Sequence, residues 1–143
     1  MPLRLKSVNG HHFSNCDSLY SISVDEKNPY LCSDGSALYN KDKSELVFVY
    51  HTVRKMSIPS SVTKIGDYAF YNCTNLSSLT LPSGVKEIGF SAFQGCKSLT
   101  SVTIPSGVKY ISSFTFRDCE SLRFINLPSD LKYIGEEAFE GCI

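Results

Sequence analysis

The chain has 143 residues, of which 42% are hydrophobic, and its 14 basic and 14 acidic side chains cancel. This length fits one domain with a continuous core, spanning residues 1–143. The balanced charge excludes the basic footprint of a nucleic-acid or anionic-membrane binder, and no apolar run is long enough to cross a bilayer. The first residues also lack the apolar core of a signal peptide.

Residues 1–24 carry an apolar pattern that recurs through the rest of the chain. Two positions depart from it: Asn9 replaces a glycine of the later copies, and His12 replaces a small alanine. A terminal copy of a repeat is often atypical, because only one side of it is covered. The residues in register with the later copies are Leu5, Val8, Phe13, Cys16, Leu19, Ile22 and Val24.

Residues 25–57 interrupt the pattern with an insertion. Cys16 and Cys73 are 57 residues apart, eleven more than two periods of 23. Short apolar runs separated by turn residues predict a small antiparallel hairpin or meander near residues 30–50. An element inserted into a repeat array maps to one face, which is often a binding face.

From residue 58 the period is regular. Copies are predicted over residues 58–80, 81–103 and 104–126, with a partial copy over 127–143. Each contains a phenylalanine three positions before a cysteine, and successive cysteines stand 23 residues apart: Cys73, Cys96, Cys119 and Cys142. A fixed repeat of this length predicts a solenoid whose coils bury one another's apolar edges.

The secondary structure of one repeat can be predicted from its alternation of apolar and polar residues. Residues 76–81 predict a strand with Ser78 and Thr80 outward, ended by a proline. A second short strand is predicted over 85–88, and about one helical turn over 89–95. The first strands are expected to be parallel and side by side at a spacing of about 4.8 Å, centred on residues 78–81, 101–104 and 124–127.

The repeat reads apolar-Pro-x-x-Val-x-x-Ile-Gly-x-x-Ala-Phe-x-x-Cys-x-x-Leu-x-x-Val. It resembles the BspA-like leucine-rich repeats of microbial surface proteins, over nearly the whole chain. The resemblance implies a leucine-rich-repeat solenoid of the α/β horseshoe type, mostly β, at the cell surface or secreted. It also implies a protein that binds other macromolecules and has no catalytic residues. A family names an architecture, so the ligand stays open.

The six cysteines are interpreted as reduced and structural. Five of them share one ladder position next to a phenylalanine, where small buried thiols are expected, although adjacent rungs near 5 Å apart do not exclude a bridge on distance alone. We expect Cys73, Cys96 and Cys119 to be buried and unbridged. Cys32 lies outside the ladder and is the candidate for a reactive thiol.

No catalytic or metal site is predicted. His11, His12 and Cys16 are the only close set of metal-ligating residues, and no second pair accompanies them. A Ser-x-x-Lys pattern typical of serine acylating enzymes begins at four equivalent positions, so a repeated turn explains it better than a nucleophile. These positions are Ser61, Ser83, Ser106 and Ser129. We expect no enzyme activity and no cofactor.

The outward strand positions form the candidate binding surface. They are rich in hydroxyls and nearly uncharged. The same composition is expected if small side chains that suit a β-strand merely face water and bind nothing. Aromatic and arginine side chains usually carry interface energy, so Lys55, Arg123 and Phe124 are the expected anchors, together with tyrosines of the insertion. The full candidate set is Lys55, Ser78, Thr80, Ser101, Thr103, Arg123, Phe124, Asn126, Tyr30 and Tyr39.

Three functions remain open at this point. The leading hypothesis is a protein-binding or adhesion module of a cell-surface or secreted microbial protein, which recognises a host or matrix protein, or a glycan. The second is a passive structural spacer within a larger surface protein. The third is an accessory domain of an enzyme, or an enzyme proper. No nucleic-acid partner and no membrane insertion are expected.

Both ends of the chain fall inside a repeat. Apolar ladder residues such as Ile134 and Phe139 are therefore expected to lack a covering coil. We expect the terminal coil to fray or to associate end to end with another molecule, and the chain to behave as a segment of a longer array.

Overall fold

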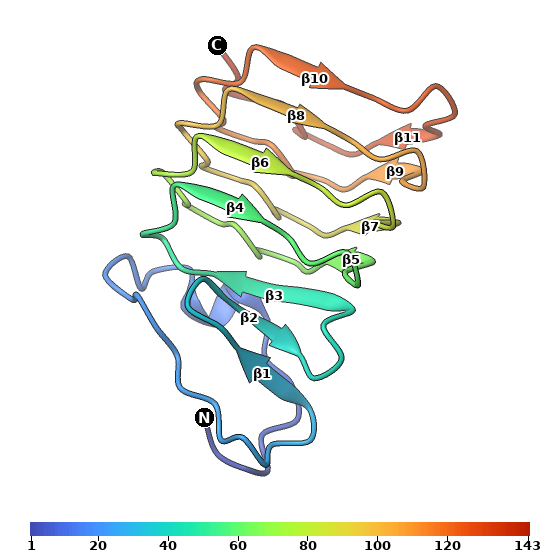
Figure 1. Ribbon diagram of the computed structural model, residues 1–143. Helices are drawn as coiled ribbons and strands as arrows, with labels where there is room; N and C mark the ends of the chain where they lie inside the picture. The colour runs from blue at the N-terminus through green and yellow to red at the C-terminus, as the bar shows by residue number, and fades with distance from the viewer.

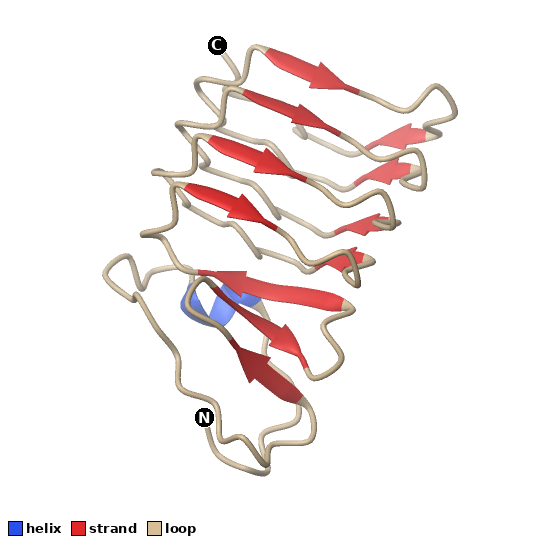
Figure 2. Cartoon of the chain, in the orientation of Figure 1, coloured by secondary structure: helices blue, strands red, loops and turns tan.

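The computed structural model describes all residues from Met1 to Ile143. The chain winds into a stack of coils, with the C-terminus at one end of the stack and a three-stranded meander near the other (Figure 1). Strands predominate, and the single helix is a short 3-10 helix, η1 (Gly10–Phe13) (Figure 2). It is far shorter and less apolar than a helix that crosses a bilayer must be.

Each coil contributes two strands. The first strands are β4 (Lys55–Ser57), β6 (Ser78–Thr80), β8 (Ser101–Thr103) and β10 (Phe124–Asn126). The second strands are β5 (Lys64–Ile65), β7 (Glu87–Ile88), β9 (Tyr110–Ile111) and β11 (Tyr133–Ile134). The pairs β4/β6 and β8/β10 are parallel, and the four first strands lie side by side (Figure 1). The predicted solenoid and its parallel strands are therefore confirmed.

The insertion forms the predicted meander. Its strands β1 (Leu31–Ser33), β2 (Ala37–Asn40) and β3 (Glu45–Val49) pair antiparallel. The carboxylate of Asp34 shapes the first turn by accepting hydrogen bonds from the amides of Ser36 and Ala37, both at 2.9 Å. Because β3 also pairs in parallel with β5, the meander extends the sheet of second strands, in the order β1-β2-β3-β5-β7.

The segments that follow the second strands, called here the turn side, contain no helix. Over residues 89–96, alternate amides donate to a carbonyl three residues back, as Ala92 does to Gly89 at 3.3 Å. The amides between them donate to the next coil, as Phe93 does to Thr115 at 2.8 Å. A helix would keep all these bonds within the segment. The expected helical turn over 89–95 is therefore wrong, because stacking takes half of its donors.

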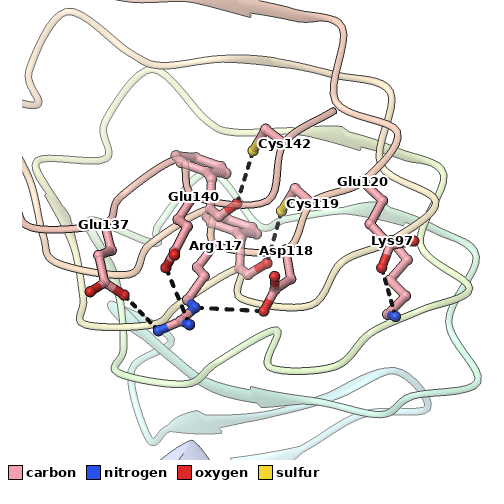
Figure 3. Close-up of polar contacts among 10 residues, drawn as sticks. Lys97, Arg117, Asp118, Cys119, Glu120, Glu137, Glu140 and Cys142 are labelled. Carbon is pink, nitrogen blue, oxygen red and sulfur yellow. Dashed lines mark hydrogen bonds and ion pairs between the residues drawn. The ribbon is translucent and has the colours of Figure 1, made fainter.

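The interior is a ladder of phenylalanines and thiols. The ring of Phe93 stacks between Phe70 and Phe116, with centroid distances of 4.8 and 5.2 Å. The thiol of Cys119 donates to the carbonyl of Phe93 at 3.1 Å, and that of Cys142 donates to the carbonyl of Phe116 at 3.2 Å (Figure 3). The prediction of buried, unbridged ladder thiols is confirmed for Cys73, Cys96 and Cys119.

Residues 1–30 do not form a regular coil, since they contain η1 and no strand. The expectation that Cys16 shares the buried ladder is wrong, because this thiol is exposed. Phe13 is half-buried and packs on Phe48, with ring centroids 4.9 Å apart. The imidazole of His12 is exposed at the position where Ala92 is fully buried, so this segment cannot approach its neighbour as the later coils do.

The last coil leaves part of its apolar ladder uncovered. Ile134 is 44% exposed, whereas the equivalent Ile111 in the preceding coil is fully buried. β11 pairs with β9 on one side only.

Candidate functional site

The outward residues of β4, β6, β8 and β10 form one continuous surface, called here the strand face. Inward residues such as Leu79 and Val102 are buried, and the residues that flank them point outward, as the two-residue period of a strand requires. The register aligns Lys55 with Ser78 and Ser101 with Phe124. The predicted residues that the structure brings together here are Lys55, Ser78, Thr80, Ser101, Thr103, Phe124 and Asn126, and all are exposed.

The strand face has large side chains at its two ends. Phe124 is 74% exposed at the end formed by β10, and Arg123 precedes it and is also exposed. Lys55 lies on β4 at the opposite end. Between these ends the face carries hydroxyl groups and no ionisable side chain.

A groove of about 390 Å³ runs along the centre of the strand face, between β6 and β8. Serine and threonine hydroxyls border it, and Leu79 and Val102 contribute its apolar lining. Although these two strands are neighbours in the stack (Figure 1), they belong to separate two-stranded sheets. The main-chain ladder is therefore interrupted here.

The two predicted tyrosines do not join the strand face. Tyr39 is 1% exposed, because the face of β2 that carries this ring packs into the main apolar core. Its proposed role in binding is therefore wrong. Burial, reinforced by the nearby Asp34, raises the pKa of the Tyr39 hydroxyl. Tyr30 is 41% exposed but immediately precedes β1, the outer strand of the other sheet, beneath the ammonium of Lys6.

A second surface, on the turn side, was missed by the sequence analysis. Tyr68 lies at its centre, with ring centroids 4.8 Å from His11 and 5.5 Å from Phe90. Together with Phe114 and Arg117, these side chains border a groove of about 350 Å³. The aromatic residues occupy variable positions of the repeat, so the period does not predict their gathering. The signal that could have indicated it is an extra aromatic residue beside the ladder phenylalanine in three successive copies.

Arg117 is held by carboxylates on this side of the molecule (Figure 3). Its guanidinium lies 2.6 Å from Glu137 and 3.2 Å from Glu140, and 3.7 Å from Asp118. A hydrogen bond with Glu137 raises the pKa of Glu140, and the charge of Arg117 opposes that rise. These contacts tie neighbouring coils together and leave Arg117 little freedom to bind a ligand anion.

His51 is a buried polar side chain without a hydrogen-bond partner for either ring nitrogen. Its Nδ1 lies 3.5 Å from the exposed carboxylate of Asp17. Asn75 donates to the main-chain carbonyl of His51 at 3.0 Å. The contact between Asp17 and His51 joins the irregular N-terminal segment to the region where the regular coils begin.

The reactive groups considered in the sequence have structural surroundings. Burial raises the pKa of the Cys32 thiol, which therefore forms less of the reactive thiolate than an ordinary cysteine. The Ser61 hydroxyl donates to the carbonyl of Lys43 at 2.9 Å, and Lys64 pairs with Glu45 at 3.1 Å. In this copy of the Ser-x-x-Lys pattern, the hydroxyl and the ammonium therefore bond to the meander segment and not to each other.

Comparisons with known proteins agree with this geometry. The family model for the BspA type leucine rich repeat region matches residues 41–143 in six copies. No curated protein matches the sequence.

Three solved structures are similar to this chain. The pneumococcal vaccine antigen PcpA is 25% identical over 81% of the chain, with a TM-score of 0.76. A leucine-rich repeat protein from Bacteroides ovatus is 41% identical over 59% of the chain, with a TM-score of 0.53. The leucine-rich repeat protein of T. pallidum is 27% identical over 84% of the chain, with a TM-score of 0.61.

The chain spans 29% of the pneumococcal antigen, 24% of the Bacteroides protein and 68% of the T. pallidum protein. Proteins built from such repeats are typically interaction scaffolds, and these similarities suggest a repeat module of a surface or secreted protein. Since the family match covers well over half of its length, this chain belongs to the BspA-type leucine-rich-repeat family.

Proposed function

We propose that this chain is a protein-binding or adhesion module of a cell-surface or secreted microbial protein, and that it contacts its macromolecular ligand with the strand face. The observation that carries the proposal is the composition of that face. It is a continuous exposed surface with a hydroxyl-rich centre, and its end presents a phenylalanine, Phe124, that is 74% exposed. Aromatic anchors beside adaptable polar groups are typical of binding surfaces.

The meander has a smaller part in this proposal than the sequence indicated. Tyr39 is buried and Tyr30 lies at the outer edge of the other sheet. A ligand on the strand face would therefore contact the coils and not the tyrosines of the insertion. Family membership and the likeness to a pneumococcal vaccine antigen support a surface location.

The proposal can be tested with immobilised matrix proteins and glycans. Collagen, fibronectin, laminin and a glycan array would be probed with the wild-type chain and with Phe124→Ser. The matched control is Tyr110→Ser, because Tyr110 is 56% exposed on β9, a second strand. We expect Phe124→Ser to weaken binding at least about tenfold, as for an interface anchor, and Tyr110→Ser to leave it unchanged.

Two outcomes would contradict the proposal. Equal losses from both variants would show that the strand face is not the contact surface. If the wild-type chain bound none of these probes, the passive spacer would be the better account. The lateral hydrogen bonds and stacked phenylalanines suit that alternative, since they would stiffen such a spacer.

A further inference from the structure

The coil of β8 and β9 carries Ser112 and Thr115 where its neighbours have a glycine and an alanine. The residue after the second strand is a glycine in the other coils, Gly66, Gly89 and Gly135, and it is Ser112 in this one. A methyl group built on Gly89 would lie 2.6 Å from the amide nitrogen of Asp67 in the preceding coil. Side-chain carbons do not approach backbone this closely, so the glycine sets how near two coils can come.

Ser112 carries a Cβ at this point of closest approach. The hydrogen bonds show the consequence. The amide of Gly89 donates to the carbonyl of Ile65 at 2.9 Å, and that of Gly135 donates to Ile111 at 2.8 Å. At Ser112 the hydroxyl takes this role and donates to the carbonyl of Ile88 at 2.8 Å. The ladder between β7 and β9 is absent, and a groove of about 310 Å³ borders the site.

The same two coils also lack main-chain hydrogen bonds between their first strands. In the neighbouring pairs of coils, the amide of Ser77 donates to Arg54 at 2.9 Å and that of Arg123 donates to Thr100 at 3.0 Å. The equivalent bond, from the amide of Thr100 to the carbonyl of Ser77, is missing. β6 and β8 share no ladder, and the groove of about 390 Å³ lies between them.

On the turn side the two coils stay joined. The amides of Phe93 and Gly95 donate to Thr115 and Arg117, both at 2.8 Å. The seam between these coils is therefore joined by main-chain hydrogen bonds along the turn side and lacks them along both strand sides. The Cβ of Ser112 thus lies between two coils that lack main-chain bonds along both of their strands.

We propose that Ser112 opens this seam to form a ligand groove in the strand face, and that the groove binds a neutral carbohydrate chain; this rests on the proposed function of that face. Four hydroxyls border the groove, from Ser78, Thr80, Ser101 and Thr103, and each can both donate and accept. Sugar hydroxyls have the same dual character.

The lining also argues against other ligands. It contains no ionisable side chain, so a phosphate or a charged peptide side chain would lose its hydration without meeting an opposite charge. An inserted peptide strand would need about twice the usual 4.8 Å spacing between β6 and β8. β6 and β8 still lie in direct backbone contact, which leaves no room for one. The groove volume lies in the range of small-ligand sites.

The structural half of the proposal is tested by hydrogen exchange of Ser112→Gly, which restores the glycine. The amides of Thr100 and Lys109 have no main-chain partner, although the equivalent Lys86 and Lys132 donate to the preceding coil. We expect both amides to exchange at least about tenfold more slowly in Ser112→Gly, because each would regain a carbonyl partner there. Ser112→Ala is the matched control. It keeps the Cβ and removes only the hydroxyl, so both amides should remain fast. Unchanged exchange in Ser112→Gly would overturn the steric origin of the groove.

The binding half is tested with neutral hexasaccharides of β1,4-linked glucose, mannose, xylose and N-acetylglucosamine, and with an acidic heparin hexasaccharide. Wild type and Ser112→Ala should bind at least one neutral chain and bind heparin more weakly. Ser112→Gly should lose at least about tenfold in affinity, although this residue lies behind the strand face. If the amides become protected while affinity is unchanged, the groove is not the ligand site.

The failures of the two proposals are distinguishable. If a matrix protein binds in a Phe124-dependent way and no neutral hexasaccharide binds, the carbohydrate groove is wrong and the proposed function stands. Preference for heparin would also overturn the neutral ligand. If neutral chains bind in a Ser112-dependent way but Phe124→Ser has no effect, the groove stands and Phe124 is not an anchor.

Discussion

The regular coils and the N-terminal segment carry the same apolar pattern and fold differently. Phe93 and Cys96 are fully buried in the coils, whereas the equivalent Phe13 is half-buried and Cys16 is exposed. The difference shows that a ladder position is buried only when the neighbouring coil can approach its backbone. Apolar side chains alone do not produce the stack.

Small residues account for this difference. In the coils, Gly89 lies against the backbone of Asp67 and Gly66, and Ala92 is fully buried. The N-terminal segment has Asn9 and His12 at these positions. Its own close contact is shifted by one residue to Gly10, where an added Cβ would lie 2.9 Å from the carbonyl oxygen of Asp67. The segment therefore packs over the end of the stack as an irregular cover.

The largest effect that tests this comparison is the loss of a ladder phenylalanine. Phe93→Ala removes a ring stacked on both sides and should cost about 3 to 5 kcal/mol. Phe13→Ala removes a half-buried ring that contacts Phe48 and should cost clearly less, below about 3 kcal/mol. Urea unfolding followed by circular dichroism measures both. Equal costs would show that the N-terminal segment is packed as tightly as a coil.

The ladder thiols make the coils sensitive to alkaline pH. Burial raises the pKa of Cys119 from an ordinary 9.0 to about 12, and it also raises those of Cys73 and Cys96. Above pH 9 the unfolded chain releases these protons while the folded chain retains them. Stability that is fully present below pH 9 is therefore lost as the pH rises towards 12, by up to about 1.4 kcal/mol per pH unit for each thiol.

The measurement is the free energy of unfolding between pH 8 and pH 11. Cys119→Ala should reduce its alkaline slope, because one titrating thiol is gone. A slope that Cys119→Ala does not alter would contradict the role of the buried ladder.

Substitutions at the small-residue positions should also affect the stability of the regular coils and of the N-terminal segment differently. Gly89→Ala brings a Cβ against the preceding coil and should cost about 1 to 3 kcal/mol by overpacking. His12→Ala restores the small residue of the repeat on an exposed segment and should change stability by no more than about 0.5 kcal/mol. Thermal melts compare the two. A large gain from His12→Ala would mean that this side chain alone keeps the segment irregular.

The smallest perturbation is alkylation of the folded protein, followed by mass spectrometry of its peptides. Iodoacetamide should modify Cys16 first, since it is exposed, and Cys32 and Cys142 more slowly. Cys73, Cys96 and Cys119 should react only after unfolding. Rapid modification of these three in the native state would show that the coils open more readily than their burial indicates.

Several features of the fold follow directly from the repeat. The two-residue alternation predicts which residues of β6, β8 and β10 point outward, and the period of 23 places them in one surface. The turn residues around Asp34 predict the meander. The candidate site could be predicted less well. Tyr39 reads as a surface residue of a hairpin, but the face of β2 that carries it packs into the main apolar core.

The direction of each side chain and the order of the coils can be derived from the amino-acid sequence, because both depend on the local period. How closely each pair of coils approaches is set by tertiary contacts. That distance depends on contacts between residues one period apart: Gly89 permits a full ladder to the preceding coil, and Ser112 does not. Tertiary contacts also set the bonding of the turns over 66–73, 89–96 and 112–119, in each of which three amides donate to the neighbouring coil, as a helix could not allow.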